Sequence, residues 1–98
     1  MNMSDHLNCK EREYEVVLNS FKESLYKEFH LERLNSKLHD WHKLDFQDFL
    51  KEILKTGEKL NYRKIMDWKR FFSIQKEKAV TLEKQIRMQK FKEERCLN

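Results

Sequence analysis

The sequence predicts an all-α protein: a long antiparallel helical hairpin, similar to a coiled coil, with a short third helix packed at one end. The 98 residues include one glycine and no proline, whereas an all-β sandwich needs turn residues about every 8–12 positions. Apolar residues also recur at the three- and four-residue steps of amphipathic helices. A chain of this length forms one small domain, so we expect a flexible N-terminus over residues 1–10 and a single helical domain over 11–98.

The first helix is expected over about residues 11–38. Its apolar residues at helical steps are Tyr14, Val17, Leu18, Phe21, Leu25, Leu31, Leu34 and Leu38. The steps drift between Leu25 and Leu31, which places the later leucines on a shifted face. We therefore allow for an irregularity near Phe29 and His30.

The second helix is expected over about residues 46–56. Asp45 has the side chain of an N-cap, Asp48 favours the positive end of the helix dipole, and Gly57 is typical of a residue that ends a helix. One face of this segment is apolar, as in an amphipathic helix, and carries Phe46, Phe49, Leu50, Ile53 and Leu54.

The third helix is expected over about residues 62–95, with Asn61 as its N-cap. Alternating steps of three and four define a heptad seam that consists of Ile65, Trp68, Phe72, Gln75, Ala79, Leu82, Ile86 and Gln89. We expect the first helix to pack along this seam. At the short end of the hairpin we expect an aromatic core formed by Trp41, Phe46, Phe49, Trp68 and Phe72, with Phe71 beside them.

Basic residues concentrate in the third helix. Residues 61–98 contain 11 lysines and arginines against 5 acids, so this part of the chain attracts anions such as a phosphate backbone. The first candidates for contacts with a DNA backbone are Lys69, Arg70, Lys76, Lys84 and Arg87. The alternative is that these residues form the solvated flank of a coiled coil, because acids interleave with them.

The sequence offers little for catalysis. A single glycine excludes a glycine-rich phosphate loop, and the absence of proline excludes the Asn-Pro-Pro-Tyr motif of adenine methyltransferases. His39 and His42 have the spacing of two metal ligands, but a structural zinc site needs four, so we predict no metal site and no cofactor. We expect a non-enzymatic protein.

The compartment is predicted from what the chain lacks. The sequence contains no run of 18 apolar residues, which a membrane-spanning helix would need. It also shows no apolar segment near its start of the kind found in secretory signals. We therefore expect a cytoplasmic protein without membrane contacts. Cys9 and Cys96 then are two reduced thiols, with a disulfide between them as the alternative.

The stretch over residues 38–86 carries a more specific pattern. It reads Leu38-x-x-Trp41-x-x-Leu44-Asp45-Phe46-x-x-Phe49-Leu50-Lys51-Glu52, then Lys59-Leu60, Asp67-Trp68, Phe72, Lys76, Ala79, Leu82 and Ile86. This order and spacing resembles the C-terminal helical region of fused type II restriction endonuclease–adenine-specific DNA methyltransferases. Members of that family continue with an acidic run and a Tyr-Gly-Leu motif, whereas this chain continues Arg87-Met88-Gln89. The resemblance therefore implies a truncated relative.

The resemblance implies a role without catalysis, because the cleavage and methylation motifs of the family lie outside the matching segment. It predicts a helical accessory module or remnant of a restriction–modification protein, which binds a methyltransferase or restriction partner, the DNA backbone, or both. The alternative from the residues alone is a coiled-coil assembly protein that forms homodimers through the seam of the third helix and has no role with nucleic acid.

Overall fold

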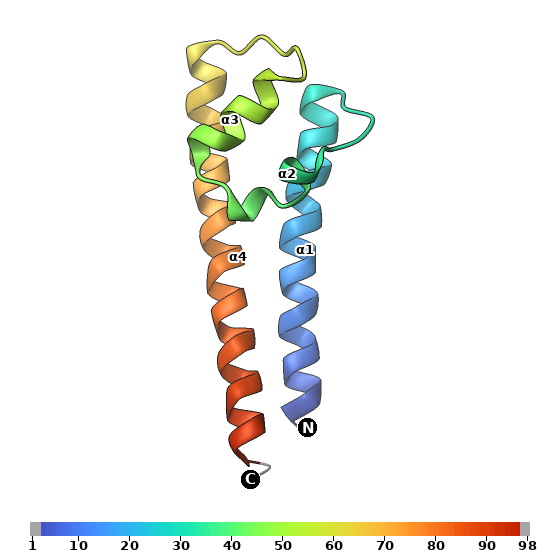
Figure 1. Ribbon diagram of the computed structural model, residues 1–98, viewed down its shortest axis with the longest axis vertical. Helices are drawn as coiled ribbons and strands as arrows, with labels where there is room; N and C mark the ends of the chain where they lie inside the picture. The colour runs from blue at the N-terminus through green and yellow to red at the C-terminus, as the bar shows by residue number, and fades with distance from the viewer. Residues whose placement is uncertain (1–2, 97–98) are drawn as a thin grey trace.

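The computed structural model describes residues 3–96 as an elongated helical hairpin (Figure 1). The two long helices, α1 (Met3–Phe29) and α4 (Tyr62–Cys96), run antiparallel, and the two ends of the chain lie at the same end of the hairpin. The molecule measures 54 × 22 × 20 Å. Its longest dimension is the length of the 35 residues of α4 at about 1.5 Å per residue.

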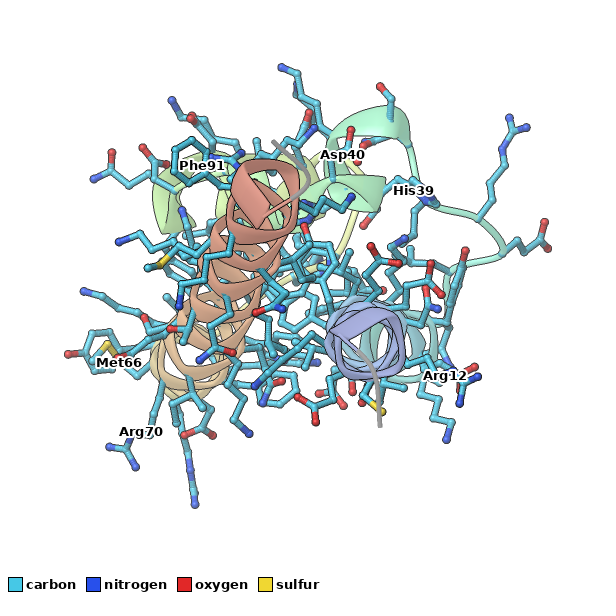
Figure 2. The ribbon with its side chains drawn as sticks, turned by 90° about the horizontal axis from the view of Figure 1, so that it is seen from below. Arg12, His39, Asp40, Met66, Arg70 and Phe91 are labelled. Atoms are coloured by element: carbon cyan, nitrogen blue, oxygen red, sulfur yellow. The ribbon has the colours of Figure 1, made fainter. Side chains whose placement is uncertain are left out.

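Three short elements cross the other end of the hairpin. They are α2 (Ser36–His39), the 3-10 helix η1 (Trp41–Lys43) and α3 (Phe46–Leu54). Figure 2 shows them on one side of the plane that contains α1 and α4. No strand occurs in the part of the chain that the structure describes, so the predicted all-α hairpin with a short helix packed at one end is confirmed.

The first helix differs from its predicted bounds of 11–38 at both ends. It begins at Met3, so residues 3–10 of the expected flexible N-terminus are helical, and residues 1–2 lie outside the described residues. It ends at Phe29, because His30 adopts a left-handed backbone with φ +52° and the N–H of Leu31 donates to the carbonyl of Tyr26 at 3.2 Å. This bond is the six-to-one bond of a Schellman motif, which closes a helix C-terminus.

The leucines assigned to the shifted face of that helix lie beyond it. Leu31 and Leu34 are half-buried residues of the loop that follows α1, and Leu38 is buried in α2. All three pack against the core. Their spacing matches the period of a helix, but these positions are apolar because each packs against the core and not because they share a face of one helix.

The predicted caps are confirmed. Asp45 accepts a hydrogen bond from the N–H of Asp48 at 2.8 Å, and Asn61 accepts one from the N–H of Lys64 at 2.8 Å. These side chains satisfy N–H groups that the first turn leaves without helical partners. Gly57 has φ +89° and lies in the turn after α3, which ends two residues before the predicted position 56.

The heptad seam of α4 is confirmed as the face that α1 covers. Trp68, Phe72 and Ala79 are buried, and the other seam residues are half-buried. Opposite them, α1 presents Phe21 and Leu25, which are fully buried. Because α1 already occupies the seam, homodimerisation through the seam itself would require the hairpin to open.

The aromatic core forms where the sequence predicts it. Trp41, Phe49, Trp68 and Phe72 are buried, and Phe46 is half-buried with its ring centroid 5.6 Å from that of Phe72. The indole N–H of the buried tryptophan also donates to the carbonyl of Leu18 at 3.3 Å, which joins η1 to α1. Four of the five predicted residues are thus buried and the fifth packs against them.

Two rings from α1 complete the core and were not predicted as part of it. Phe21 lies at its centre, with its centroid 5.6 Å from that of Phe49 and 6.0 Å from that of Phe72. Phe29 packs against Trp68 at 5.1 Å. The core therefore joins all the helical elements at this end of the hairpin.

Candidate interaction surfaces

The predicted DNA contacts fall on two sides of α4. Lys69, Lys76, Lys84 and Arg87 share one side of the helix at 3.6 residues per turn, and we call these four residues the basic face. Arg70 lies about 100° further around the helix from Lys69. Figure 2 shows its side chain extending away from the hairpin.

Two residues of the basic face are engaged within the protein. The amine of Lys76 donates to the carbonyl of Leu44 and lies 5.7 Å from the ring centroid of Phe72, so this lysine helps to hold η1 and α4 together. Arg87 forms an ion pair with Glu83 at 2.5 Å, one turn earlier in α4. The exposed cations among the five candidates are therefore Lys69, Arg70 and Lys84, together with the ion-paired guanidinium.

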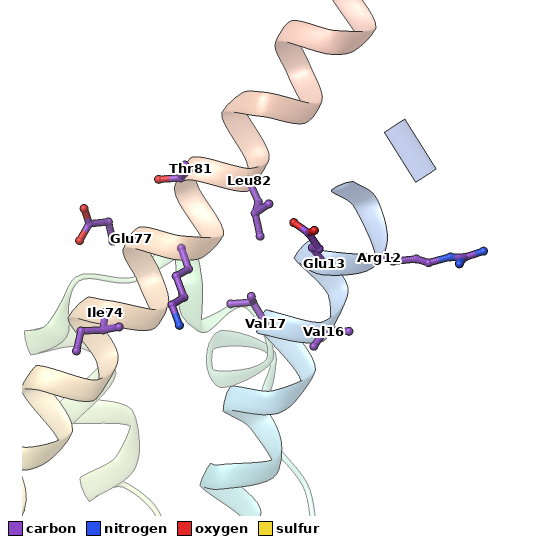
Figure 3. Close-up of a pocket in the computed structure, with 9 residues that line it drawn as sticks. Arg12, Glu13, Val16, Val17, Ile74, Glu77, Thr81 and Leu82 are labelled. Carbon is purple, nitrogen blue, oxygen red and sulfur yellow. The ribbon is translucent and has the colours of Figure 1, made fainter. Parts of the chain in front are cut away.

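An apolar groove lies between α1 and α4 on the side opposite α3. Val16 and Val17 of α1 and Ile74 and Leu82 of α4 form its apolar walls (Figure 3), and its volume is about 730 Å³. Val16 is 65% exposed and Ile74 48% exposed, so both present aliphatic surface to solvent. We call this feature the apolar groove.

Both arms of the hairpin carry charge along the apolar groove. Arg12 and Glu13 line it on α1, and Glu77 and Lys78 line it on α4. Figure 3 shows the Arg12 side chain extending away from α4. Each arm contributes one acid and one base, so the border has no net charge. A phosphate backbone gains nothing from such a border, whereas a protein surface with both signs of charge complements it.

The sequence did not predict the apolar groove. Val16 is adjacent to Val17, which packs against the core from α1, and Ile74 is adjacent to the seam residue Gln75. The sequence did contain a sign of the groove. With Val16 and Ile74 included, the apolar stripes of the two helices are wider than a strict coiled-coil seam, which uses only two positions in seven.

The two histidines of the His39-x-x-His42 pair do not converge on a common site. His42 is buried, with its ring centroid 6.0 Å from that of Tyr14 and 5.8 Å from that of Trp41. His39 is exposed, and its Nε2 lies 3.4 Å from the amine of Lys22. Among the described residues, no group of three or more His, Cys, Asp or Glu side chains could hold a metal ion, and Cys9 is an exposed free thiol.

The surroundings of His42 shift two pKa values. Burial lowers the pKa of the His42 imidazole below 6.5, and the nearby carboxylate of Asp40 offsets part of that effect. Burial also raises the pKa of the Tyr14 hydroxyl above 10, and the negative charge of Glu83 adds to the increase. Both side chains are therefore neutral at pH 7, as expected of packing residues between α1, η1 and α4.

Comparison with known proteins identifies the family but no activity. A family model described as "Domain of unknown function (DUF8810)" matches residues 2–90, and the chain therefore belongs to that family. No curated protein and no solved structure matches the chain. Within residues 3–96, no helix is long and apolar enough to cross a membrane.

Proposed function

We propose that this protein is a non-catalytic helical accessory module of a restriction–modification system, located in the cytoplasm. In this proposal it binds a methyltransferase–endonuclease protein and contacts the DNA backbone next to it. The proposal combines the resemblance over residues 38–86 with two surfaces of the hairpin, the basic face and the apolar groove.

The observation that carries the proposal is that the aromatic residues of the matching segment, residues 38–86, lie together in one core. Trp41, Phe46, Phe49, Trp68 and Phe72 all meet in the aromatic core at the closed end of the hairpin. They are residues that maintain a helical architecture, so the resemblance supports a shared scaffold and transfers no reacting group. A scaffold of this kind acts by presenting its surfaces to partners.

The DNA contact in this proposal uses the exposed cations of α4. Lys69, Arg70 and Lys84 reach solvent on two sides of the helix, and Arg87 is exposed despite its pair with Glu83. Lysine and arginine contacts to phosphates release counterions without reading bases, so binding should be independent of sequence and strongly dependent on salt.

Fluorescence anisotropy with a labelled duplex of about 20 base pairs tests the DNA contact, with salt raised from about 50 to 200 mM. The triple variant K69A/R70A/K84A should bind less tightly and show a smaller salt slope. The matched control is K27A/K51A/K59A, which removes three exposed lysines elsewhere and changes the net charge by the same amount. Equal losses in the two variants, or no binding by the wild type at low salt, would refute a DNA role for α4.

Binding of the protein partner has its own test. A methyltransferase–endonuclease encoded beside this chain should co-elute with it in size-exclusion chromatography at concentrations of about 10 µM, as expected of a specific complex. Separate elution of the two proteins, in the presence as well as the absence of DNA, would reject the accessory role.

A further inference from the structure

We propose that the side of α4 that points away from α1 is a docking site for an acidic amphipathic helix of another protein. We call this side the outer face. It comprises the residues of α4 that lie within about 60° of the direction opposite the heptad seam, at about 100° per residue. The occupant carries carboxylates between two groups of apolar side chains. The inference goes beyond the proposed DNA and methyltransferase contacts and does not depend on either.

The first argument is the apolar surface of the outer face. Six of the nine large apolar side chains that are exposed among the described residues belong to this face: Tyr62, Met66, Ile74, Val80, Met88 and Phe91. Two pairs are each one helical turn apart, Tyr62 with Met66 and Met88 with Phe91, so apolar surface is concentrated near both ends of the face. Figure 2 shows the side chains of Met66 and Phe91 extending away from α1. Clustered exposed apolar side chains are typical of protein interaction sites.

The second argument is the charge of the same face. Among its described side chains it carries four cations, Arg63, Arg70, Lys84 and Lys92, and one acid, Glu77. Arg70 and Lys84 lie between the two apolar pairs, and both are exposed. A partner with carboxylates at the corresponding positions complements this arrangement, whereas a basic partner is repelled by it.

The third argument is a shallow hollow at one apolar pair. Met88 and Phe91 line it together with Arg87 and Lys92, and its volume is about 550 Å³. An apolar side chain that enters the hollow contacts the methionine and the ring, and a neighbouring carboxylate of the same partner reaches the two cations. The hollow therefore combines the two properties of the outer face within one turn of the helix.

The mixture of cations and apolar side chains favours a protein helix over nucleic acid or a membrane. A phosphate backbone contacts the cations but gains nothing from Met66 or Met88. A membrane buries a continuous apolar face with cations at its margins, whereas Arg70 and Glu77 lie in the middle of the outer face and would be drawn into the hydrocarbon. A second helix packs its side chains between those of α4 and meets both kinds of residue.

Fluorescence anisotropy with a synthetic helix tests the proposal. The outer face extends for about 44 Å from Tyr62 to Phe91, so the probe is a labelled peptide of about 30 residues, with leucines near both ends of one face and glutamates between them. The full chain should bind it with a Kd of about 100 µM or tighter. Lysines in place of the glutamates should weaken binding at least about tenfold, and R70E/K84E should weaken binding of the acidic peptide by a similar factor.

The matched control for charge is K27E/K59E. It reverses two exposed lysines outside α4 and should leave the Kd for the acidic peptide within about twofold of the wild type. All four positions are exposed, so far-ultraviolet circular dichroism should show unchanged helicity in both variants. Equal losses in the two variants, equal binding of the acidic and basic peptides, or no binding at about 1 mM would overturn the proposal.

The apolar part of the face has a separate test. M66S/M88S should weaken binding of the acidic peptide about fivefold and leave binding of duplex DNA unchanged, because only the helix uses the methionines. V16S/Y26S, which changes two exposed apolar residues of α1, should alter neither. Vesicles that contain phosphatidylglycerol are the remaining probe. If they bind the wild type but not M66S/M88S, and the peptide does not bind, the outer face belongs to a membrane contact and the proposal is wrong.

Discussion

Phe21 and Trp41 stack ring on ring, with centroids 3.9 Å apart and planes inclined by 26°. The phenylalanine lies in α1 and the tryptophan in η1, and neither retains any exposed surface. The same phenylalanine contacts the rings of Trp68 and Phe71 in α4, so a single side chain joins three elements. Aromatic contacts of this kind add to the area that the rings bury.

Replacement of Phe21 by alanine should be among the most damaging single changes in the chain. The variant leaves a cavity within the aromatic core, and we expect the free energy of unfolding to fall by about 3–5 kcal/mol. Urea denaturation followed by tryptophan fluorescence measures the loss. Tyr26→Ala removes a partly exposed ring from the same helix and should cost clearly less; similar losses would contradict the central place of Phe21.

His30→Gly should stabilise the protein. His30 has φ +52°, a left-handed conformation that costs a residue with a β-carbon roughly 1–2 kcal/mol and costs glycine little. The greater freedom of glycine in the unfolded chain offsets part of the gain, so we expect about 0.5–1 kcal/mol in thermal or urea unfolding. His30→Ala keeps a β-carbon and should give no gain, and a gain of equal size would contradict the explanation.

The stability of the hairpin should fall as the pH drops below 6.5, through His42. Burial lowers the pKa of this imidazole in the folded state, so the unfolded chain takes up a proton first and acid favours unfolding. His42→Gln should remove this part of the pH dependence between about pH 7 and 5.5 in urea titrations. His39→Gln removes an exposed imidazole and should retain it; an unchanged slope in His42→Gln would contradict the prediction.

Lys76→Ala should affect folding more than DNA binding. Its amine bonds the carbonyl of Leu44 and lies over the ring of Phe72, so its loss should cost about 1–2 kcal/mol of stability. Lys69→Ala removes an exposed amine from the same basic face and should have a stability within about 0.5 kcal/mol of the wild type. Parallel urea titrations and DNA anisotropy measure both effects, and a DNA defect larger for Lys76 than for Lys69 would contradict this division.

Local signals account for the parts of the fold that the sequence predicted. Asp45 and Asn61 mark the starts of two helices, because the side chain of each accepts a hydrogen bond from the backbone N–H three residues later. The sequence of α4 contains no glycine or proline to interrupt its seam. The predicted end of the first helix, at residue 38, was wrong, because α1 ends at Phe29. His30 is not a typical helix stop, and the leucines beyond it keep helical spacing although tertiary packing places them in a loop.

The surfaces were harder to predict than the core. The amine of Lys76 donates a hydrogen bond to the carbonyl of Leu44, 32 positions earlier in the chain. The distribution of charges along the sequence does not reveal such a contact. The apolar groove depends on Val16 and Ile74, which flank the seam and become neighbours only when α1 lies beside α4. Both features follow from long-range packing.

The antiparallel course of α1 and α4 places Met3 and Cys96 together, while the aromatic core lies toward the far end of a 54 Å rod. A fluorescent protein or affinity tag joined at either terminus would therefore lie at the open end of the hairpin, away from α2, η1 and α3. Reporters attached there leave the opposite tip and the flanks of the helices free for binding experiments.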